Sequence, residues 1–327
     1  MSHFYRASLA LLIGSIIAFR YCPKRAAYRR EAALLLTAAD VLDSGSDVNS
    51  LSRISQRLPV TEFVYLGGSV LRDGSIRINP SFNASYIRNV VRRFEGVSTV
   101  LLALSIFDFV DSTSDVAKFV LYAQDIIDAY KVHGFLFVVS EEGRDLRGKE
   151  WETLRDMLIA TRSLRGSGPD AVIAPFMFTV DNNLTIWDDF ETYKPWLYAD
   201  YAYAKLFSFD VDPEVEIGFP WVNLISDAYA GESQRICQLS LVVSCFNRKK
   251  GSTTVRSYRD IVKSGGDPEG SGFFEGYYFN TPKTIRRKTS LVNERNLLGM
   301  GLADIRGDLP SSNKSLLWAM ISSLMQE

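Results

Sequence analysis

The chain has 327 residues, 46% of them hydrophobic and 23% charged, which is typical of a folded protein with a sizeable core and excludes a mainly disordered chain. Its net charge of −1 at pH 7 provides no electrostatic field that would attract nucleic acid or an anionic membrane. The two histidines and three cysteines lack metal-ligand spacing, so we expect no metal and no cofactor, and a Ser-His-Asp hydrolase is disfavoured.

The N-terminal segment contains an uncharged apolar run, residues 7–19, with basic residues on both sides. A membrane-spanning helix needs about 20 apolar residues, so the run is short for an anchor and more typical of a signal peptide. We expect residues 1–31 to be a signal peptide or a short membrane anchor, and the protein to be secreted or membrane-anchored; a buried strand is the alternative. The glycosylation sequons at Asn83, Asn183 and Asn313 agree with a secretory route.

From residue 32 onward, short apolar runs alternate with longer amphipathic stretches. In chain order they predict strands at 32–39 and 62–70, a helix at 85–94, a strand at 98–107, a helix at 114–130, a strand at 135–140, a helix at 151–164 and a strand at 171–180. They continue with a short helix at 190–197, strands at 199–207 and 239–246, a helix at 285–296, a strand at 298–305 and a helix at 315–324. The first of these strands is equally compatible with a helix.

Two further segments have a simple interpretation. Residues 248–272 are rich in glycine, serine and charge, and we interpret them as a long surface loop. Arg286, Arg287 and Lys288 form a charged run that is typical of a solvated helix face.

Strands that alternate with helices predict a parallel α/β protein. Eight such units between residues 32 and 327 favour a closed (β/α)₈ barrel, whose usual size is about 250 residues. A doubly wound open sheet is the alternative. No glycine-rich phosphate loop follows the first strand, which disfavours dinucleotide binding.

The order of these segments resembles glycoside hydrolase family 18, the chitinases and chitinase-like lectins. The clearest match, residues 277–310, resembles the family's last helix, last strand and acidic loop. The segments 60–78, 96–107, 124–143 and 239–248 resemble the regions of its second, third, fourth and seventh strands. The resemblance implies a (β/α)₈ TIM barrel over residues 32–327, with the family's insertion after strand 7 much reduced.

The family's fourth strand carries the motif D-G-x-D-x-D-x-E, whose glutamate protonates the leaving oxygen while the last aspartate assists the substrate's acetamide group. An alignment without gaps places Leu136 and Val138 at the second and third aspartates and Ser140 at the glutamate. Because a serine hydroxyl cannot protonate a leaving alkoxide at useful rates near neutral pH, the resemblance implies a pseudoenzyme. The alternative is a divergent glycosidase acting on N-acetylglucosamine polymers, with Glu141 or Glu142 as its acid. Placing Glu141 at the acid position requires the alignment of this strand to move by one residue, which reverses which side chains face inward.

The resemblance also implies which residues would line a ligand groove at the strand ends. The candidates follow the third, sixth and eighth strands and are Phe107, Asp108, Phe207, Ser208, Ala303 and Asp304. Ala303 stands in place of the family's sugar-stacking tryptophan, and this replacement weakens the affinity for a sugar. Phe107 and Phe207 either offer ring faces to a ligand or pack in the core. We therefore expect a non-catalytic protein that binds chitin, an N-acetylglucosamine oligosaccharide or an extracellular protein.

Overall fold

The computed structural model describes most of the chain from Glu31 to Met325. The described residues are 31–37, 59–110, 115–141, 144–166, 172–179, 186–208, 211–233, 238–309 and 313–325. The apolar run at 7–19 and the sequon residue Asn183 lie outside them. No helix within these ranges is long and apolar enough to cross a membrane.

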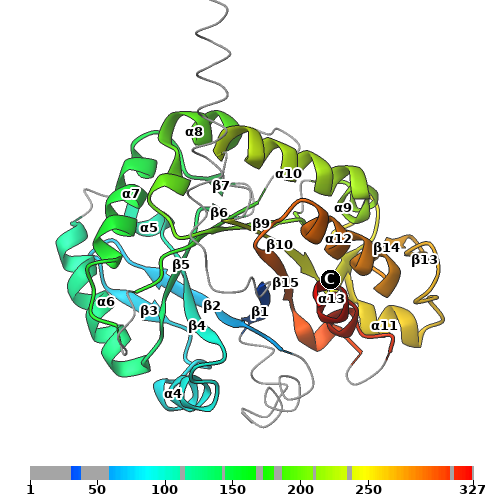
Figure 1. The fold of residues 1–327 in the computed structure, drawn as a ribbon, viewed down its shortest axis with the longest axis horizontal. Coiled ribbons are helices and arrows are strands. Elements are labelled where there is room, and N and C mark those ends of the chain that lie inside the picture. Colours follow the sequence, from blue (N-terminus) through cyan, green and yellow to red (C-terminus); the bar gives the residue numbers. More distant parts are fainter. Residues whose placement is uncertain are drawn as a thin grey trace, which may run out of the picture.

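Eight parallel strands in the described chain close into a barrel (Figure 1). They are β1 (Glu31–Thr37), β2 (Glu62–Val70), β4 (Thr99–Ser105), β5 (Gly134–Val138), β8 (Phe176–Thr179), β9 (Ala202–Lys205), β10 (Leu239–Ser244) and β15 (Gly299–Ala303). All eight predicted strands are present, and the first is a strand and not a helix. Because β1 pairs with both β2 and β15, the sheet has no open ends, which excludes the doubly wound alternative. The short β3 (Ile76–Ile78) pairs antiparallel with β2.

Helices surround the barrel on its outside (Figure 1). The longer ones are α4 (Ala84–Arg93), α6 (Val116–Tyr130), α7 (Lys149–Thr161), α8 (Ile186–Tyr193), α10 (Phe219–Ser233), α12 (Pro282–Glu294) and α13 (Leu316–Leu324). The short ones include α5 (Phe107–Val110), α9 (Pro213–Ile217), and the 3₁₀ turns η1 (Pro195–Leu197) and η3 (Ile305–Gly307).

The helix predicted at 190–197 is two elements, α8 and the 3₁₀ turn η1. Lys194 between them has the left-handed φ of 47°, and Pro195, which has no N–H to donate, cannot continue the helix. The sequence pattern missed α10 altogether, because its apolar residues do not form one stripe; Leu224 is exposed while Val222 and Ile225 are buried.

Each barrel strand is buried on both faces. On β1, for example, Ala33 and Leu35 face the barrel interior, whereas Leu34 and Leu36 pack against the outer helices. This explains why the strands appear in the sequence as continuous apolar runs and not as alternating ones.

The connection from β10 to α12, residues 245–281, is structured. It holds the antiparallel pair β11 (Phe246–Arg248) and β12 (Val255–Ser257), helix α11 (Tyr258–Lys263), and the antiparallel pair β13 (Phe273–Phe274) and β14 (Tyr277–Tyr278). The prediction of a plain surface loop at 248–272 is therefore wrong. Ser257 caps α11 by accepting from the Asp260 N–H at 3.1 Å, and Tyr258 and Ile261 are buried.

A polar cluster fills the barrel interior at the amino ends of the strands. The fully buried Glu62 carboxyl accepts hydrogen bonds from the Tyr201 hydroxyl at 2.5 Å and from the Tyr203 hydroxyl, and Ser240 donates to Glu31 at 3.0 Å. Burial, followed by the neighbouring Glu31 charge, raises the pKa of Glu62 well above its ordinary value. This end of the barrel thus holds a pair of carboxyl groups that share a polar environment closed to solvent.

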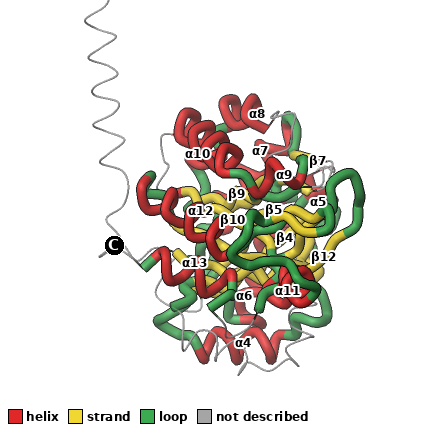
Figure 2. The backbone as a smooth tube through the Cα atoms, turned by 90° about the vertical axis from the view of Figure 1, so that its right-hand side faces the viewer, coloured by secondary structure: helices red, strands yellow, loops and turns green. Residues whose placement is uncertain are grey.

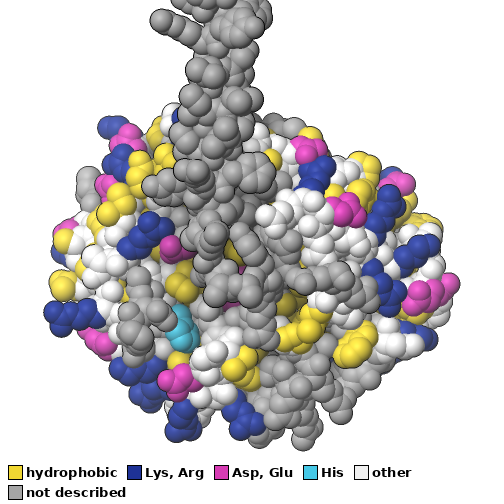
Figure 3. Space-filling model, viewed as in Figure 1, with side chains coloured by type: hydrophobic (Ala, Val, Ile, Leu, Met, Phe, Trp, Pro, Cys, Tyr) yellow, Lys and Arg dark blue, Asp and Glu magenta, His cyan; other side chains and the backbone are white. Residues whose placement is uncertain are grey.

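The surface agrees with the near-zero net charge. On the face shown in Figure 3, basic and acidic side chains are interspersed around the rim. Of the sequon residues, Asn83 and Asn313 are both exposed. Asn83 also caps α4, where its side-chain oxygen accepts from the Tyr86 N–H at 2.9 Å.

Candidate ligand-binding site at the barrel mouth

The mouth is the end of the barrel formed by the carboxyl ends of the eight strands, where (β/α)₈ barrels carry their functional residues. Three elements that follow strand carboxyl ends gather on the right-hand side of Figure 2, namely α5, β12 and β7 (Arg144–Asp145) of the hairpin with β6 (Ser140–Glu141). The mouth therefore lies on that side of the molecule.

The fourth barrel strand presents apolar side chains and one hydroxyl to the interior. Leu136 and Val138 belong to the interior cluster, whereas Phe137 and Val139 face outward. Continuing this alternation places the buried Ser140 on the inner side. Its hydroxyl oxygen has no hydrogen-bond partner among the described residues.

Glu141 has a different position from Ser140. It is exposed and pairs with Arg144 across the β6–β7 hairpin. Because consecutive residues of a strand point to opposite faces, its side chain is directed away from the inner side that Ser140 occupies. Glu142 lies outside the described residues.

The candidates after the third strand lie on α5. Phe107 packs with the outer core, and the Arg144 guanidinium covers its ring at 4.7 Å from the centroid. Arg144 is held there by an ion pair with Glu150 at 3.0 Å. Phe107 is 5% exposed and offers no open ring face, while Asp108 beside it is exposed.

The candidates after the sixth strand are better placed for a ligand. Lys205 and Phe207 continue the inward side of β9, and the Lys205 ammonium lies 5.0 Å from the centroid of the Phe207 ring. The backbone N–H of Ser208 donates to the carboxylate of Glu216 on α9 at 2.5 Å. This contact ties the chain after β9 to the helix that follows it.

The candidates after the eighth strand differ in accessibility. Ala303 is buried in the barrel interior. Asp304 has the left-handed φ of 58°, and its carboxylate accepts from the Ser244 hydroxyl at 3.0 Å. Ser244 also accepts from the Phe246 N–H at 2.9 Å, so this serine links the ends of β10 and β15.

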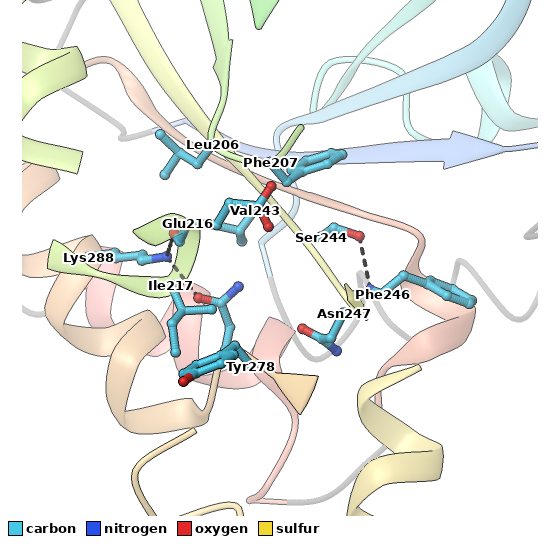
Figure 4. A pocket seen from close by; sticks show the side chains of 11 residues that line it. Leu206, Phe207, Glu216, Ile217, Val243, Ser244, Phe246, Asn247, Tyr278 and Lys288 are labelled. Atoms are coloured by element: carbon cyan, nitrogen blue, oxygen red, sulfur yellow. Dashed lines mark hydrogen bonds between the residues drawn. The ribbon is translucent and has the colours of Figure 1, made fainter. Parts of the chain in front are cut away.

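A small pocket opens beside the ends of β9 and β10 (Figure 4). Its volume of about 20 Å³ holds roughly one water molecule. It is lined by Leu206, Phe207, Glu216, Ile217, Val243, Ser244, Phe246, Asn247, Tyr278, Asn280 and Lys288. The pocket therefore combines ring faces with amide, carboxyl and ammonium groups, but it is far smaller than the roughly 300 Å³ or more of a small-molecule site.

Two titratable groups in this pocket have shifted pKa values. Burial raises the pKa of Glu216 to about 7, against the opposing effects of the Ser208 N–H and the Arg248 guanidinium. Burial also lowers the pKa of Lys288 to about 8, against the opposing effect of Glu216. The Lys288 ammonium donates to the Asn280 side chain at 2.8 Å.

The burial of Lys288 corrects the expectation of a solvated charged run. Arg286 and Arg287 are exposed as predicted, but Lys288 is only 1% exposed. Helical spacing offered a signal that the charge pattern concealed, because Lys288 follows Ile285 by three residues and precedes Val292 by four. It therefore lies on the apolar stripe of α12. The sequence held no comparable signal for Glu216 as a site residue, because its partners other than Ser208 are distant along the chain.

No group of three or more His, Cys, Asp or Glu side chains in the described chain is arranged to hold a metal ion. Cys245 is buried in the core.

Comparison with known proteins identifies the fold. No protein-family model and no curated protein matches the chain. A chitinase structure from Bacteroides thetaiotaomicron has a TM-score of 0.68 at 14% identity, over 91% of this chain and 97% of that chain. A chitinase-like agglutinin from Robinia pseudoacacia has a TM-score of 0.69 at 15% identity, over 89% of this chain and 99% of that chain.

A third structure shows ligands on the same fold. The family GH18 chitinase from Cycas revoluta, in complex with allosamidin, has a TM-score of 0.67 at 13% identity, over 90% of this chain and 98% of that chain. It is also known in complex with (GlcNAc)₃. At this level of identity the likeness establishes the fold, so the described chain is a closed (β/α)₈ barrel of the kind found in family-18 chitinases and chitinase-like proteins.

Proposed function

We propose that this protein is a chitinase-like pseudoenzyme that binds a glycan at the barrel mouth without cleaving it. The observation that carries the proposal is the inner side of β5, where Leu136, Val138 and Ser140 stand in the positions that the resemblance assigns to the acid motif. Glycoside hydrolysis needs a carboxyl group beside the scissile oxygen to protonate the leaving group. The described inner face of this strand supplies only apolar groups and a hydroxyl.

The pocket beside β9 and β10 holds only about one water molecule, so it supports contact with a sugar at its opening and not enclosure of a sugar ring. Its lining includes the Phe207 and Tyr278 rings and the Asn247 amide (Figure 4), together with the Asn280 amide. Rings stack on the apolar face of a sugar, and amides hydrogen-bond to its hydroxyl and acetamide groups. A chitinase-like agglutinin and a (GlcNAc)₃ complex occur among the similar structures, which favours an N-acetylglucosamine oligosaccharide as the ligand class.

Two assays of the purified protein test this proposal. We expect no hydrolysis of a fluorogenic chitooligosaccharide, and heat of binding with chitotriose in calorimetry. Phe207→Ala should weaken binding at least about fivefold, since it removes an aromatic contact of about 1 kcal/mol or more. The control Leu121→Ala truncates an exposed side chain on the outside of α6 and should leave the affinity unchanged.

Other outcomes have clear meanings. Turnover that Glu141→Gln abolishes would show a divergent active glycosidase and overturn the proposal. Absence of any heat with chitotriose would remove this ligand class and leave an extracellular protein as the partner to seek.

We also propose that the protein enters the secretory pathway, supported by the apolar run at 7–19 and by the exposed sequon residues Asn83 and Asn313. N-terminal sequencing of the mature product from secreting cells decides between cleavage and anchoring. An intact N-terminus on a product that remains in the cytosol would contradict this route.

A further inference from the structure

The Glu216 carboxylate connects segments that are far apart in the chain. It accepts from the Ser208 N–H at 2.5 Å and from the Arg248 guanidinium at 2.9 Å. The same guanidinium nitrogen also donates to the Val211 carbonyl at 2.5 Å. The backbone carbonyl of Glu216 accepts from the Lys288 ammonium at 3.2 Å. One residue of α9 therefore joins the chain after β9, strand β11 and helix α12.

These contacts are shielded from solvent. The side chains of Glu216 and Arg248 are each 11% exposed, and Lys288 is 1% exposed. Figure 4 shows Glu216 and Lys288 together in the wall of the pocket that Phe207 also lines. Since buried hydrogen bonds to charged groups are stronger than those to neutral groups, the charge of this carboxylate determines how firmly its partners are held.

We propose that Glu216 is a positioning residue that fixes Phe207 at the mouth through the adjacent Ser208 N–H, so that ligand binding weakens when its carboxylate takes up a proton. The part of this inference that concerns affinity rests on the proposed glycan function. The part that concerns the position of the chain after β9 does not.

Two groups of this cluster titrate near neutral pH, Glu216 with a pKa of about 7 and Lys288 with a pKa of about 8. Facing Glu216 are Arg248 from β11 and Lys288 from α12, and its own pKa is raised to about 7 by burial. The Tyr278 hydroxyl of β14 pairs instead with Glu214 on the exposed side of α9, at 3.1 Å. Between pH 8 and pH 6 the carboxylate therefore changes from mostly charged to mostly neutral, and its attraction for Arg248 is lost.

For the fold as a whole, this protonation is stabilising. The folded pKa lies above the ordinary 4.5, so the contribution of Glu216 to the free energy of unfolding is fully present below pH 4.5. That contribution falls as the pH rises through about 7. At pH 6 the neutral carboxyl is tolerated in its buried place while its contacts to Ser208 and Arg248 are weaker.

The experiment compares the natural protein, Glu216→Gln and the control Glu214→Gln at pH 6 and pH 8. The control removes an exposed carboxylate two residues earlier on the same helix. Hydrogen exchange, corrected for intrinsic rates, is measured on a peptide spanning residues 199–208, and chitotriose affinity is measured by calorimetry. In the natural protein and in Glu214→Gln, we expect protection and affinity to fall about fivefold from pH 8 to pH 6, the difference between charged and neutral acceptors.

Glu216→Gln should show the low values at both pH values, because its amide accepts from Ser208 without the charge. Equal protection of this peptide in all three proteins at both pH values would overturn the inference. So would chitotriose binding that is independent of pH in the natural protein. If chitotriose does not bind at any pH, the proposed ligand class fails, and the exchange measurement alone decides the positioning role of Glu216.

Discussion

At the scale of single residues, Ser140 and Ser98 show that a buried serine hydroxyl can be hydrogen-bonded or left without a partner among the described residues. Both are buried serines at a barrel strand. The Ser98 hydroxyl donates to the Val60 carbonyl at 2.7 Å, whereas the Ser140 hydroxyl has no partner among the described residues. A buried polar group without a partner costs free energy, and such groups concentrate at functional positions.

Replacement of Ser140 by alanine should therefore stabilise the protein. Ser140→Ala removes an unsatisfied buried hydroxyl and should raise the free energy of unfolding by about 1 kcal/mol. The matched change Ser98→Ala removes a hydrogen-bonded hydroxyl and should lower it by about 1 kcal/mol. Chemical denaturation of both variants measures the difference, and a loss of stability on Ser140→Ala equal to that of Ser98→Ala would contradict the assignment.

At the scale of elements, the barrel strands approach their neighbours so closely that some positions admit only glycine. A Cβ atom built on Gly134, the first residue of β5, would collide with the backbone carbonyl oxygen of Ile173. Gly134 and Ile173 form a parallel bridge between β5 and the segment before β8. The start of the fourth strand thus depends on the absence of a side chain.

Substitution at Gly134 should accordingly weaken the barrel. Gly134→Ala forces the β5 and β8 segments apart and should cost about 3 kcal/mol of unfolding free energy. Gly231→Ala is the control, because this exposed glycine of α10 has no atom within 4 Å of an added Cβ. It should stabilise the protein by up to about 1 kcal/mol through helix propensity. Similar denaturation midpoints for the two variants would refute the close approach at β5.

At the scale of the whole molecule, the two ends of the barrel carry different polar groups. The mouth holds the pocket with Glu216 and Lys288, and the opposite end holds Glu62 and Glu31 among tyrosine hydroxyls. The pocket with Glu216 and Lys288 opens to solvent beside β9 and β10, whereas Glu62 is fully enclosed. The closed end therefore bears on the stability of the barrel, and the open end carries the proposed ligand site.

The enclosed carboxyl pair should make stability depend on pH. Because the folded pKa of Glu62 is raised, its contribution is present below pH 4.5 and is lost as the pH rises through the raised value. Glu62→Gln resembles the protonated form, so its melting temperature should fall less between pH 5 and pH 9 than that of the natural protein. Glu95→Gln, at an exposed position, should follow the natural protein. If the melting temperatures of all three proteins changed equally between pH 5 and pH 9, Glu62 would not be the source of the pH dependence.

The sequence alone determined the eight strands and the order of the fold, because a strand buried on both faces must be apolar throughout, as β1 and β10 are. The resemblance of residues 124–143 to the family's fourth strand implied an altered acid motif, and the alternation of side chains predicted which of its residues face inward. Only the tertiary structure revealed the contacts among Ser208, Glu216, Arg248 and Lys288. Hydrophobic periodicity records which face of an element is buried, but it carries no information on which distant segment covers that face.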